Sequence, residues 1–286
     1  MSLGFLFFLL CNLIGGVLPE LPEVETTKRG IAPFLLSETI ESIEVRNGRL
    51  RWPISDEVYA LESQKVRRIL RRGKYIILEF DHGAMIIHLG MSGSMRIVEP
   101  DAEIKKHDHV VFYLSSEKQI RFNDPRRFGS VLWTKDWVEH VLINKLGPEP
   151  LSEEFDADYL YILAKQRKLA IKQFLMNSHV VVGVGNIYAN ESLFLAGIHP
   201  KRAANNISLK RIQILVEKIK LVLDNAIQQG GTTLKDFVGS DGKPGYFQQQ
   251  LFVYGRGGLA CKYCEQELKE FRMNNRTTVF CKKCQI

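Results

Sequence analysis

Short apolar runs dominate the pattern of hydrophobic and polar positions in the first half of the chain. They are rich in β-branched and aromatic residues and are separated by Gly, Asp or Ser, as strands joined by turns are. The runs cover residues 75–80, 85–89, 110–114 and 130–133. One helix precedes them, from Glu23 to Leu36, because Pro22 suits a first helical turn. The pattern predicts an antiparallel sandwich or barrel.

From Ser152 to about Gln229 the apolar positions recur with helical spacing instead. The clearest helix opens at Ser208, a favoured N-cap residue, and stops at Gly230-Gly231. One face of this helix carries Ile212, Leu215, Val216, Ile219, Val222 and Leu223. We interpret this stripe as a core face.

The change from strand to helix pattern falls at Gly147-Pro148-Glu149-Pro150, and the chain becomes strand-like again from Gln248. We therefore predict an α+β protein with an antiparallel β-sandwich domain and flanking helices at 19–147. A helical domain follows at 151–247, and a small C-terminal module follows at 248–286.

Residues 1–18 are set apart from these domains, because positions 3–18 are almost entirely apolar. No Lys or Arg precedes the run and no small-x-small cleavage site ends it, so it lacks the features of a signal peptide. It is also shorter than the roughly 20 residues that span a bilayer. We interpret it as sequence upstream of a natural start at the codon for Leu18. The alternative is an apolar strand or helix native to the fold, and Cys11 within it carries no assigned role.

Composition and charge favour a globular protein with a polyanionic partner. The chain has 286 residues with 45% hydrophobic content, enough to bury substantial cores, and its length favours two domains. A formal net charge of +7 and a pI near 9.1 make nucleic acid the leading candidate. Basic residues concentrate at 65–68, 71–74 and 165–168, although such clusters are usually solvated faces.

Four of the five cysteines form two pairs, Cys261-x2-Cys264 and Cys281-x2-Cys284, separated by residues 265–280. Two such pairs can close a tetrahedral thiolate site for zinc. Four protein ligands leave no open position for catalysis, so we expect one structural zinc ion. The alternative is two disulfides, which is disfavoured because nothing else in the sequence indicates an oxidising compartment.

Two further motifs have weaker signals. Gly183-Val184-Gly185-Asn186 precedes a helical segment, so it offers a phosphate site in principle. It lacks the third glycine and the βαβ context of a dinucleotide site, and Asn186 by itself is more simply an N-cap. In His107-Asp108-His109, strand alternation sends the two histidines to one face and Asp108 to the other. No third metal ligand is evident for them.

Four features of the sequence belong together. They are the opening Pro19-Glu20-Leu21-Pro22-Glu23-Val24-Glu25, the 183–186 loop, the cysteine module and Asn274-Asn275-Arg276-Thr277. In combination they resemble the bacterial formamidopyrimidine-DNA glycosylases of the Fpg/Nei family. The resemblance covers nearly the whole chain from Pro19 onward. Further agreement lies at residues 45–51, 88–94, 124–129 and 240–246. It implies a helix-two-turn-helix domain with a zinc finger. The opening favours this branch over endonuclease VIII-like relatives, which typically open Pro-Glu-Gly-Pro, and so favours oxidised purines as substrates.

The resemblance implies four catalytic residues. Pro19 attacks C1′ of the damaged nucleotide with its free amine, and Glu20 as a carboxylic acid helps to open the sugar ring. Lys74 acts as proton donor and phosphate partner in β-elimination, and Arg276 serves δ-elimination. Because the pKa of arginine is high, a phosphate clamp suits Arg276 better than proton donation. An internal Pro19 has only an amide nitrogen, so residues 1–18 would have to be absent for this chemistry.

The resemblance also implies the DNA contacts. Met91, Arg126 and Phe128 fill the space that the extruded nucleotide leaves, with Arg126 on the orphaned cytosine. Without the family match, Met91 and Phe128 would be assigned to the core. Backbone contacts fall to His107, Arg167 and Asn186. The family often has lysine at the position of Arg167, a departure that keeps the charge. Residues 238–246 resemble a lid over the extruded base.

The expected activity is therefore that of a bifunctional DNA glycosylase and AP lyase of base excision repair. It would remove 8-oxoguanine and formamidopyrimidines from duplex DNA by a proline Schiff base and β,δ-elimination, with no redox or nucleotide cofactor. We expect a monomer in the bacterial cytoplasm, associated with the nucleoid and not with a membrane. Two alternatives stay open: a lesion-binding protein without catalysis if residues 1–18 are retained, and an oxidised-pyrimidine glycosylase.

Overall fold

The computed structural model describes residues 19–231 and 250–286. The segment 1–18, with Cys11, lies outside the described residues, and so does the lid predicted at 238–246.

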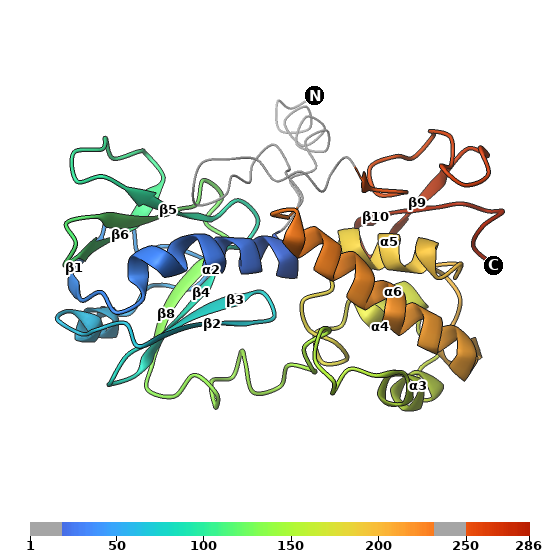
Figure 1. Ribbon diagram of the computed structural model, residues 1–286, viewed down its shortest axis with the longest axis horizontal. Coiled ribbons are helices and arrows are strands. Elements are labelled where there is room, and N and C mark those ends of the chain that lie inside the picture. The colour runs from blue at the N-terminus through green and yellow to red at the C-terminus, as the bar shows by residue number, and fades with distance from the viewer. Residues whose placement is uncertain (1–18, 232–249) are drawn as a thin grey trace, which may run out of the picture.

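The first part of the described chain contains two four-stranded antiparallel sheets, drawn at the left of Figure 1. The first sheet has the order β1 (Ile40–Val45), β6 (Asp108–Leu114), β7 (Gln119–Asn123), β5 (Ser94–Val98). The second has the order β2 (Arg68–Arg72), β3 (Tyr75–Glu79), β4 (Ala84–His88), β8 (Ser130–Thr134). A 3-10 helix, η1 (Asp56–Leu61), follows β1. The predicted sandwich is confirmed.

The apolar runs of β3 and β4 are continuous because both faces of these strands are covered. Met85 and Ile87 belong to the core between the sheets, together with Phe112 of β6. Ile86 points the other way and packs in a second cluster with Ile143, which follows β8. Two-sided burial therefore replaces the usual alternation of polar and apolar positions.

Helix α2 (Leu21–Leu35) joins the strand-rich part to the helical part. It begins two residues before the predicted start, since Glu20 and Glu23 form a capping box ahead of it. The helix contacts β2, β3 and β5 on one side and α6 on the other. In Figure 1 it crosses the middle of the molecule. The residues at its start are thereby carried to the junction of the two parts.

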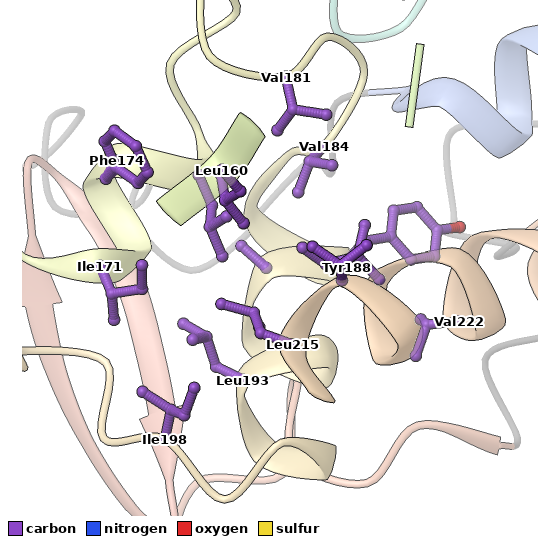
Figure 2. Packing of buried hydrophobic residues seen from close by; sticks show 14 of the residues in the cluster. Leu160, Ile171, Phe174, Val181, Val184, Tyr188, Leu193, Ile198, Leu215 and Val222 are labelled. Carbon is purple, nitrogen blue, oxygen red and sulfur yellow. The ribbon is translucent and has the colours of Figure 1, made fainter. Parts of the chain in front are cut away.

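The helical part begins after residue 150. It contains α3 (Ala157–Lys165), α4 (Ile171–Leu175), α5 (Asn186–Leu195), η2 (Ala204–Asn206) and α6 (Leu209–Gln228). Ser208 is the N-cap of α6, and all six residues of the predicted stripe are buried. Figure 2 shows Leu215 and Val222 of this stripe converging with Tyr188 and Leu193 of α5 in the core of this part. Within the described ranges, no helix combines the length and apolarity needed to cross a bilayer.

The chain ends in a hairpin of β9 (Lys269–Met273) and β10 (Arg276–Phe280), flanked by the two cysteine pairs. β10 packs against α5. The hairpin turn is Asn274-Asn275, and both residues are left-handed, with φ of 47° and 59°. Asparagine tolerates this conformation better than most residues, so a two-residue turn can form here without glycine.

Candidate active site and nucleic-acid interface

Glu20 is the N-cap of α2, and its side chain is buried against the start of α5. Its Oε1 accepts a hydrogen bond from the amide of Ile187 at 3.0 Å, and its Oε2 accepts one from Tyr188 at 3.4 Å. Gly185 makes room for the carboxyl group, since a Cβ there would lie 2.2 Å from Cδ of Glu20. Exposed amides at a helix start need acceptors, and here the acceptor is a carboxyl group of the protein itself.

This contact corrects two expectations about residues 183–186. The amides of Ile187 and Tyr188 at the start of α5 are engaged by Glu20, so these two groups do not form the predicted phosphate site. The N-cap is Gly185, and Asn186 is the first residue of the helix. Asn186 instead donates from Nδ2 to the carbonyl of Thr277 at 3.2 Å. The loop therefore connects α2 to the C-terminal hairpin.

Glu23 supports Glu20 from one helical turn away. Its Oε2 accepts the backbone amide of Glu20 at 2.9 Å, and its Oε1 accepts the hydroxyl of Tyr188 at 2.7 Å. The side chain is 1% exposed. The sequence allowed a solvent-facing residue here as readily as a supporting one, and the solvent-facing interpretation is wrong.

Lys74 lies at the tip of the β2–β3 hairpin, where Gly73 has a φ of +56°. Glu149 fixes this tip by accepting the amide of Gly73 at 2.6 Å and the guanidinium groups of Arg71 at 2.7 Å and Arg72 at 3.1 Å. Lys74 itself is half-buried. Burial lowers its pKa, and the charge of Arg276 lowers it further, while Glu20 and Glu23 act in the opposite direction.

Arg276 lies at the tip of the β9–β10 hairpin, and its side chain is exposed. The hairpin is held from below by Lys172 of α4, whose Nζ donates to Oγ1 of Thr278 at 2.7 Å and to the carbonyl of Thr277 at 3.2 Å. Lys172 is buried, and this burial lowers its pKa to about 7, with Arg276 contributing in the same direction. Arg276 thus acts electrostatically on both the half-buried Lys74 and the buried Lys172.

Met91, Arg126 and Phe128 lie on two neighbouring connections that cross from one sheet to the other. Met91 is half-buried between β4 and β5, while Arg126 and Phe128 lie between β7 and β8. The Arg126 guanidinium stacks 5.2 Å from the ring centre of Phe128. Phe128 is 45% exposed, so the alternative of a core residue is wrong for it.

The four cysteines of the C-terminal module gather at one point. Their sulfur atoms all lie within 4.8 Å of one another, with Cys261 4.0 Å from Cys284 and Cys264 3.4 Å from Cys281. Zinc–sulfur bonds of about 2.3 Å in a tetrahedron place sulfurs about 3.8 Å apart, so this arrangement fits a single ion. All four are free cysteines, which removes the disulfide alternative. No other group that could hold a metal occurs in residues 19–231 and 250–286.

The comparisons with known proteins agree with this geometry over most of the chain. Residues 18–131 match the formamidopyrimidine-DNA glycosylase N-terminal domain, and residues 146–238 match the formamidopyrimidine-DNA glycosylase H2TH domain. The formamidopyrimidine-DNA glycosylase of Marinobacter nauticus is 55% identical over 269 residues, covering 94% of this chain and 100% of that protein. The chain belongs to the formamidopyrimidine-DNA glycosylase family. The relative from Photobacterium profundum is 54% identical over 268 residues, with the same coverage.

Solved structures of formamidopyrimidine-DNA glycosylases have the same fold. The crystal structure of the MutM (Fpg) protein from Thermus thermophilus has a TM-score of 0.85 at 34% identity, covering 93% of this chain and 98% of that one. A complex of a Lactococcus lactis FPG mutant with Fapy-dG containing DNA has a TM-score of 0.87 at 33% identity, covering 93% and 99%. The Lactococcus lactis Fpg complex with abasic site containing DNA has a TM-score of 0.86 at 34% identity, with the same coverage.

Two predicted DNA contacts of the family lie away from Glu20. His107 is half-buried just before β6, and its ring is 6.1 Å from that of His109, so the two histidines lie together as alternation predicts. Asp108 is buried, with its Oδ1 accepting from Nη2 of Arg96 at 2.5 Å. Arg167 is exposed in the turn after α3.

Three residues near the glycosylase-family site were not singled out from the sequence. Lys172 looked like an ordinary helix position, and nothing in its spacing shows that it is buried. His88 ends an apolar run; its ring stacks on Tyr75 at 4.9 Å, and burial, with the charges of Lys74 and Arg51, lowers its pKa to about 4. Burial and the charge of Glu20 raise the pKa of Tyr254 to about 12. For His88, its place in the family-like segment 88–94 was the available signal.

Proposed function

We propose that this member of the formamidopyrimidine-DNA glycosylase family is a bifunctional DNA glycosylase and AP lyase of base excision repair. Its substrates are oxidised purines, 8-oxoguanine and formamidopyrimidines, in duplex DNA. The observation that carries the proposal is the junction at Glu20, where a buried carboxyl group follows Pro19 and bonds the start of α5, and where Glu20 and Arg276 both act electrostatically on Lys74. The solved Lactococcus lactis complexes with Fapy-dG and abasic-site DNA support it.

The proposed first step is a displacement at C1′ of the damaged nucleotide. The amine of Pro19, as an N-terminal residue, forms a bond to C1′ while the bond from C1′ to the base nitrogen breaks, and the proton that the amine nitrogen gives up balances the proton that the leaving base takes up. Glu20 gives a proton to the ring oxygen, the ring opens, and the nitrogen lone pair completes a Schiff base. The amides of Ile187 and Tyr188 and the hydrogen bond of Glu23 keep the Glu20 side chain in one orientation for this transfer.

The proposed second stage is strand cleavage. Loss of a proton from C2′ of the Schiff base expels the 3′ phosphate in β-elimination, and a further elimination expels the 5′ phosphate. A lysine of lowered pKa can exchange a proton at a lower pH than a solvated lysine can, which suits Lys74 for the first of these steps. Arg276 holds a phosphate during the second, because its guanidinium stays charged.

The DNA contacts are proposed in the same frame. Met91, Arg126 and Phe128 form a wedge that enters the duplex where the damaged nucleotide has left, and Arg126 bonds the opposite cytosine. His107, Arg167 and Asn186 grip the DNA backbone, so affinity should fall with salt by about 0.9 log units per log unit for each neutralised phosphate.

The four cysteines are proposed to hold one structural Zn²⁺. Bound there, the ion adds no reactive position and fixes the ends of the β9–β10 hairpin, which carries Arg276. We propose further that the protein acts as a monomer on duplex DNA in the bacterial cytoplasm, at the nucleoid. Its division into 19–147, 151–247 and 248–286 separates the sandwich, the helix-two-turn-helix domain and the zinc finger.

The experiment that tests the proposal is borohydride trapping on a duplex with 8-oxoguanine opposite cytosine. The 286-residue chain is compared with a chain that begins at Pro19, and mass spectrometry verifies both N-termini. Trapping by the shorter chain alone supports the N-terminal amine as nucleophile. Trapping by neither chain favours a lesion-binding protein without catalysis, and equal trapping by both means that another amine attacks. Competition with oxidised pyrimidines tests the other family alternative.

A further inference from the structure

Asp124 is a fully buried carboxylate that the reaction does not use. It lies at the start of the connection from β7 to β8, and its side chain is 0% exposed. Its Oδ1 accepts the hydroxyl of Ser92 at 2.7 Å, and its Oδ2 accepts the amide of Gly129 at 2.8 Å. A longer contact of 3.3 Å joins Oδ1 to the amide of Arg126.

The bond from Ser92 crosses between the two connections that carry the wedge, whereas the bonds from Arg126 and Gly129 lie within the β7–β8 connection. Ser92 follows Met91 on the β4–β5 connection, whereas Arg126 and Gly129 enclose Phe128 on the β7–β8 connection. Ser92 also accepts the amide of Arg126 at 3.2 Å through its hydroxyl oxygen. One carboxylate therefore fixes the bases of both loops, while the exposed ring of Phe128 projects beyond it.

The backbone of Asp124 links a third DNA-facing segment to the same point. Its amide donates to the carbonyl of His107 at 3.0 Å, and its own carbonyl accepts from Nε2 of His109 at 2.8 Å. His107 is the proposed backbone contact just before β6. Three segments of the sandwich that carry proposed DNA contacts thus meet at Asp124.

Gly90 and Gly129 allow the two connections to approach closely at Asp124, because a side chain at either position would clash with the backbone of the facing segment. A Cβ on Gly90 would lie 2.3 Å from the amide nitrogen of Gly129, and one on Gly129 would lie 2.7 Å from the carbonyl oxygen of His88. Arg127, between the two wedge residues, has a φ of +56°, a conformation that costs a non-glycine residue energy. The loop is therefore held in a conformation that it would not adopt alone.

We propose that Asp124 is a positioning residue that joins Met91, Arg126 and Phe128 into one rigid wedge, so that they enter the duplex together. This inference rests on the proposed function, because it assumes that these three side chains meet DNA. A carboxylate suits the task because it only accepts hydrogen bonds, and each group facing it is a donor. An asparagine would turn one NH2 group toward a donor and break part of the clamp.

The consequence is a role in specificity. While the clamp holds, the position of Arg126 opposite the orphaned base depends on the position of Met91 on the other loop. If the hydrogen bonds of Asp124 are lost, Met91 and Arg126 can each change position independently of the other. A mismatched base opposite the lesion is then accommodated more readily. Asp124→Asn should reduce the preference for 8-oxoguanine opposite cytosine over adenine, in kcat/KM, by roughly tenfold, with most of the change in KM.

The test is a double-mutant cycle in chains that begin at Pro19. Met91→Ala, Phe128→Ala and the double variant are made with Asp124 intact and again with Asp124→Asn, and single-turnover excision opposite cytosine is measured for each. With Asp124 intact, the double variant should lose much less activity than the product of the two single losses, because breaking either loop disables the shared wedge. With Asp124→Asn, the two losses should multiply.

Controls separate this clamp from general stability. Asp136→Asn is the matched control, because Asp136 also accepts two backbone amides, those of Val138 and Glu139, but on an exposed loop after β8. It should leave the opposite-base preference unchanged. If Asp124→Asn does not fold, Ser92→Ala removes the two hydrogen bonds that the hydroxyl makes across the loops, to Asp124 and from Arg126, but leaves the bond from Gly129 to Asp124, and should reduce both the preference and the coupling in part. Borohydride trapping on a preformed abasic site verifies an intact Pro19 site in every variant.

Each outcome bears on a different claim. Equal coupling with and without Asp124, together with an unchanged opposite-base preference in both Asp124→Asn and Ser92→Ala, overturns the clamp while leaving the wedge intact. If Met91→Ala and Phe128→Ala each excise as fast as the unaltered chain, the wedge itself is wrong, and the proposed function loses these contacts. Coupling that disappears only with Asp124→Asn or weakens with Ser92→Ala supports the clamp.

Discussion

The two hairpin tips that carry Lys74 and Arg276 have similar charges in different environments. The β2–β3 tip is fixed by three bonds to Glu149, and its Lys74 is half-buried with a lowered pKa. The β9–β10 tip turns through two left-handed asparagines and leaves Arg276 exposed. The sandwich thus supplies an enclosed amine, and the C-terminal module supplies a solvated guanidinium.

This difference agrees with the proposal that proton transfer belongs to the Lys74 tip and phosphate binding to the Arg276 tip. Burial favours the neutral form of a lysine, so Lys74 can give and take a proton at a pH where a solvated lysine stays charged. A guanidinium keeps its charge and presents a fork of donors that matches a phosphate. Substitutions at Glu20, at Lys74 and around Arg276 test this proposal.

The largest effect is expected from substituting Glu20. Glu20→Gln leaves a side chain that accepts hydrogen bonds but gives no acid proton, so base excision should fall by about 10³-fold, within the range of general acid catalysis. Binding to lesion DNA should be preserved. Single-turnover excision and fluorescence anisotropy measure the two quantities. Glu41→Gln on the exposed face of β1 is the control, and undiminished excision by Glu20→Gln would contradict the acid role.

The next effect is expected at the enclosed tip. Lys74→Arg keeps the charge but removes a group that can exchange a proton, so β-elimination at an abasic site should slow by roughly 10²-fold. The unaltered chain should change rate with pH below the ordinary lysine range, because the pKa of Lys74 is lowered, and the variant should lose that dependence. Strand cleavage from about pH 6 to 9 measures both. Arg276→Lys serves as the reciprocal variant and should leave β-elimination nearly unchanged.

A smaller effect is expected at the exposed tip. Cys264→Ser removes a thiolate from the cluster below the hairpin, which should disorder the Arg276 tip and weaken DNA binding about tenfold, with a salt dependence reduced by about 0.9 log units or more. Anisotropy across a salt series and metal analysis of the purified protein measure these changes. Arg276→Ala should reproduce the change in salt dependence while retaining the metal. If Cys264→Ser loses the metal but keeps its affinity for DNA, the proposal that zinc positions Arg276 is wrong.

The last effect concerns stability rather than activity, at Lys172, which binds the hairpin of the exposed tip. Lys172 has a pKa of about 7 in the folded chain, whereas a free lysine has about 10.4. Between these values the unfolded chain binds more protons, so the contribution of Lys172 to the free energy of unfolding rises with pH. The stability of the unaltered chain relative to Lys172→Met should therefore rise from about pH 7 to 10, by at most about 1.4 kcal/mol per pH unit. Urea unfolding measures it, with exposed Lys168→Met as control; a falling difference would mean that the folded pKa is not lowered.

Elements with strong local patterns were predictable from the sequence. An apolar stripe predicts α6, and an uninterrupted apolar run predicts β3. The spacing of the cysteines predicts the cysteine cluster. β2 and β7 escaped individual prediction because Arg68–Arg72 resembles a solvated basic cluster and Arg121 interrupts an apolar run. Arg121 is 1% exposed, and its guanidinium is satisfied by carbonyls of residues 102 and 103, which no local pattern reveals.

Only part of the candidate site was predictable from the sequence. Residues with a distinctive motif, such as Pro19-Glu20 and Arg276, could be nominated from the family resemblance. The contact between Glu20 and the start of α5 could not, because it depends on how two distant segments pack. The same holds for Lys172, whose lowered pKa arises from burial against the β9–β10 hairpin. Local sequence specifies elements and chemistry, while long-range packing determines which groups become buried together.

The bond between Glu20 and the amide of Ile187 also has a consequence for biosynthesis. The two residues are 167 positions apart in the chain, so the first residues to leave the ribosome acquire their partner only after the helical part has emerged. A product truncated before Ile187 would contain the sandwich strands but would leave Glu20 without the amides that orient it. Synthesis of the chain as far as the start of α5 is therefore a condition for orienting the Glu20 side chain.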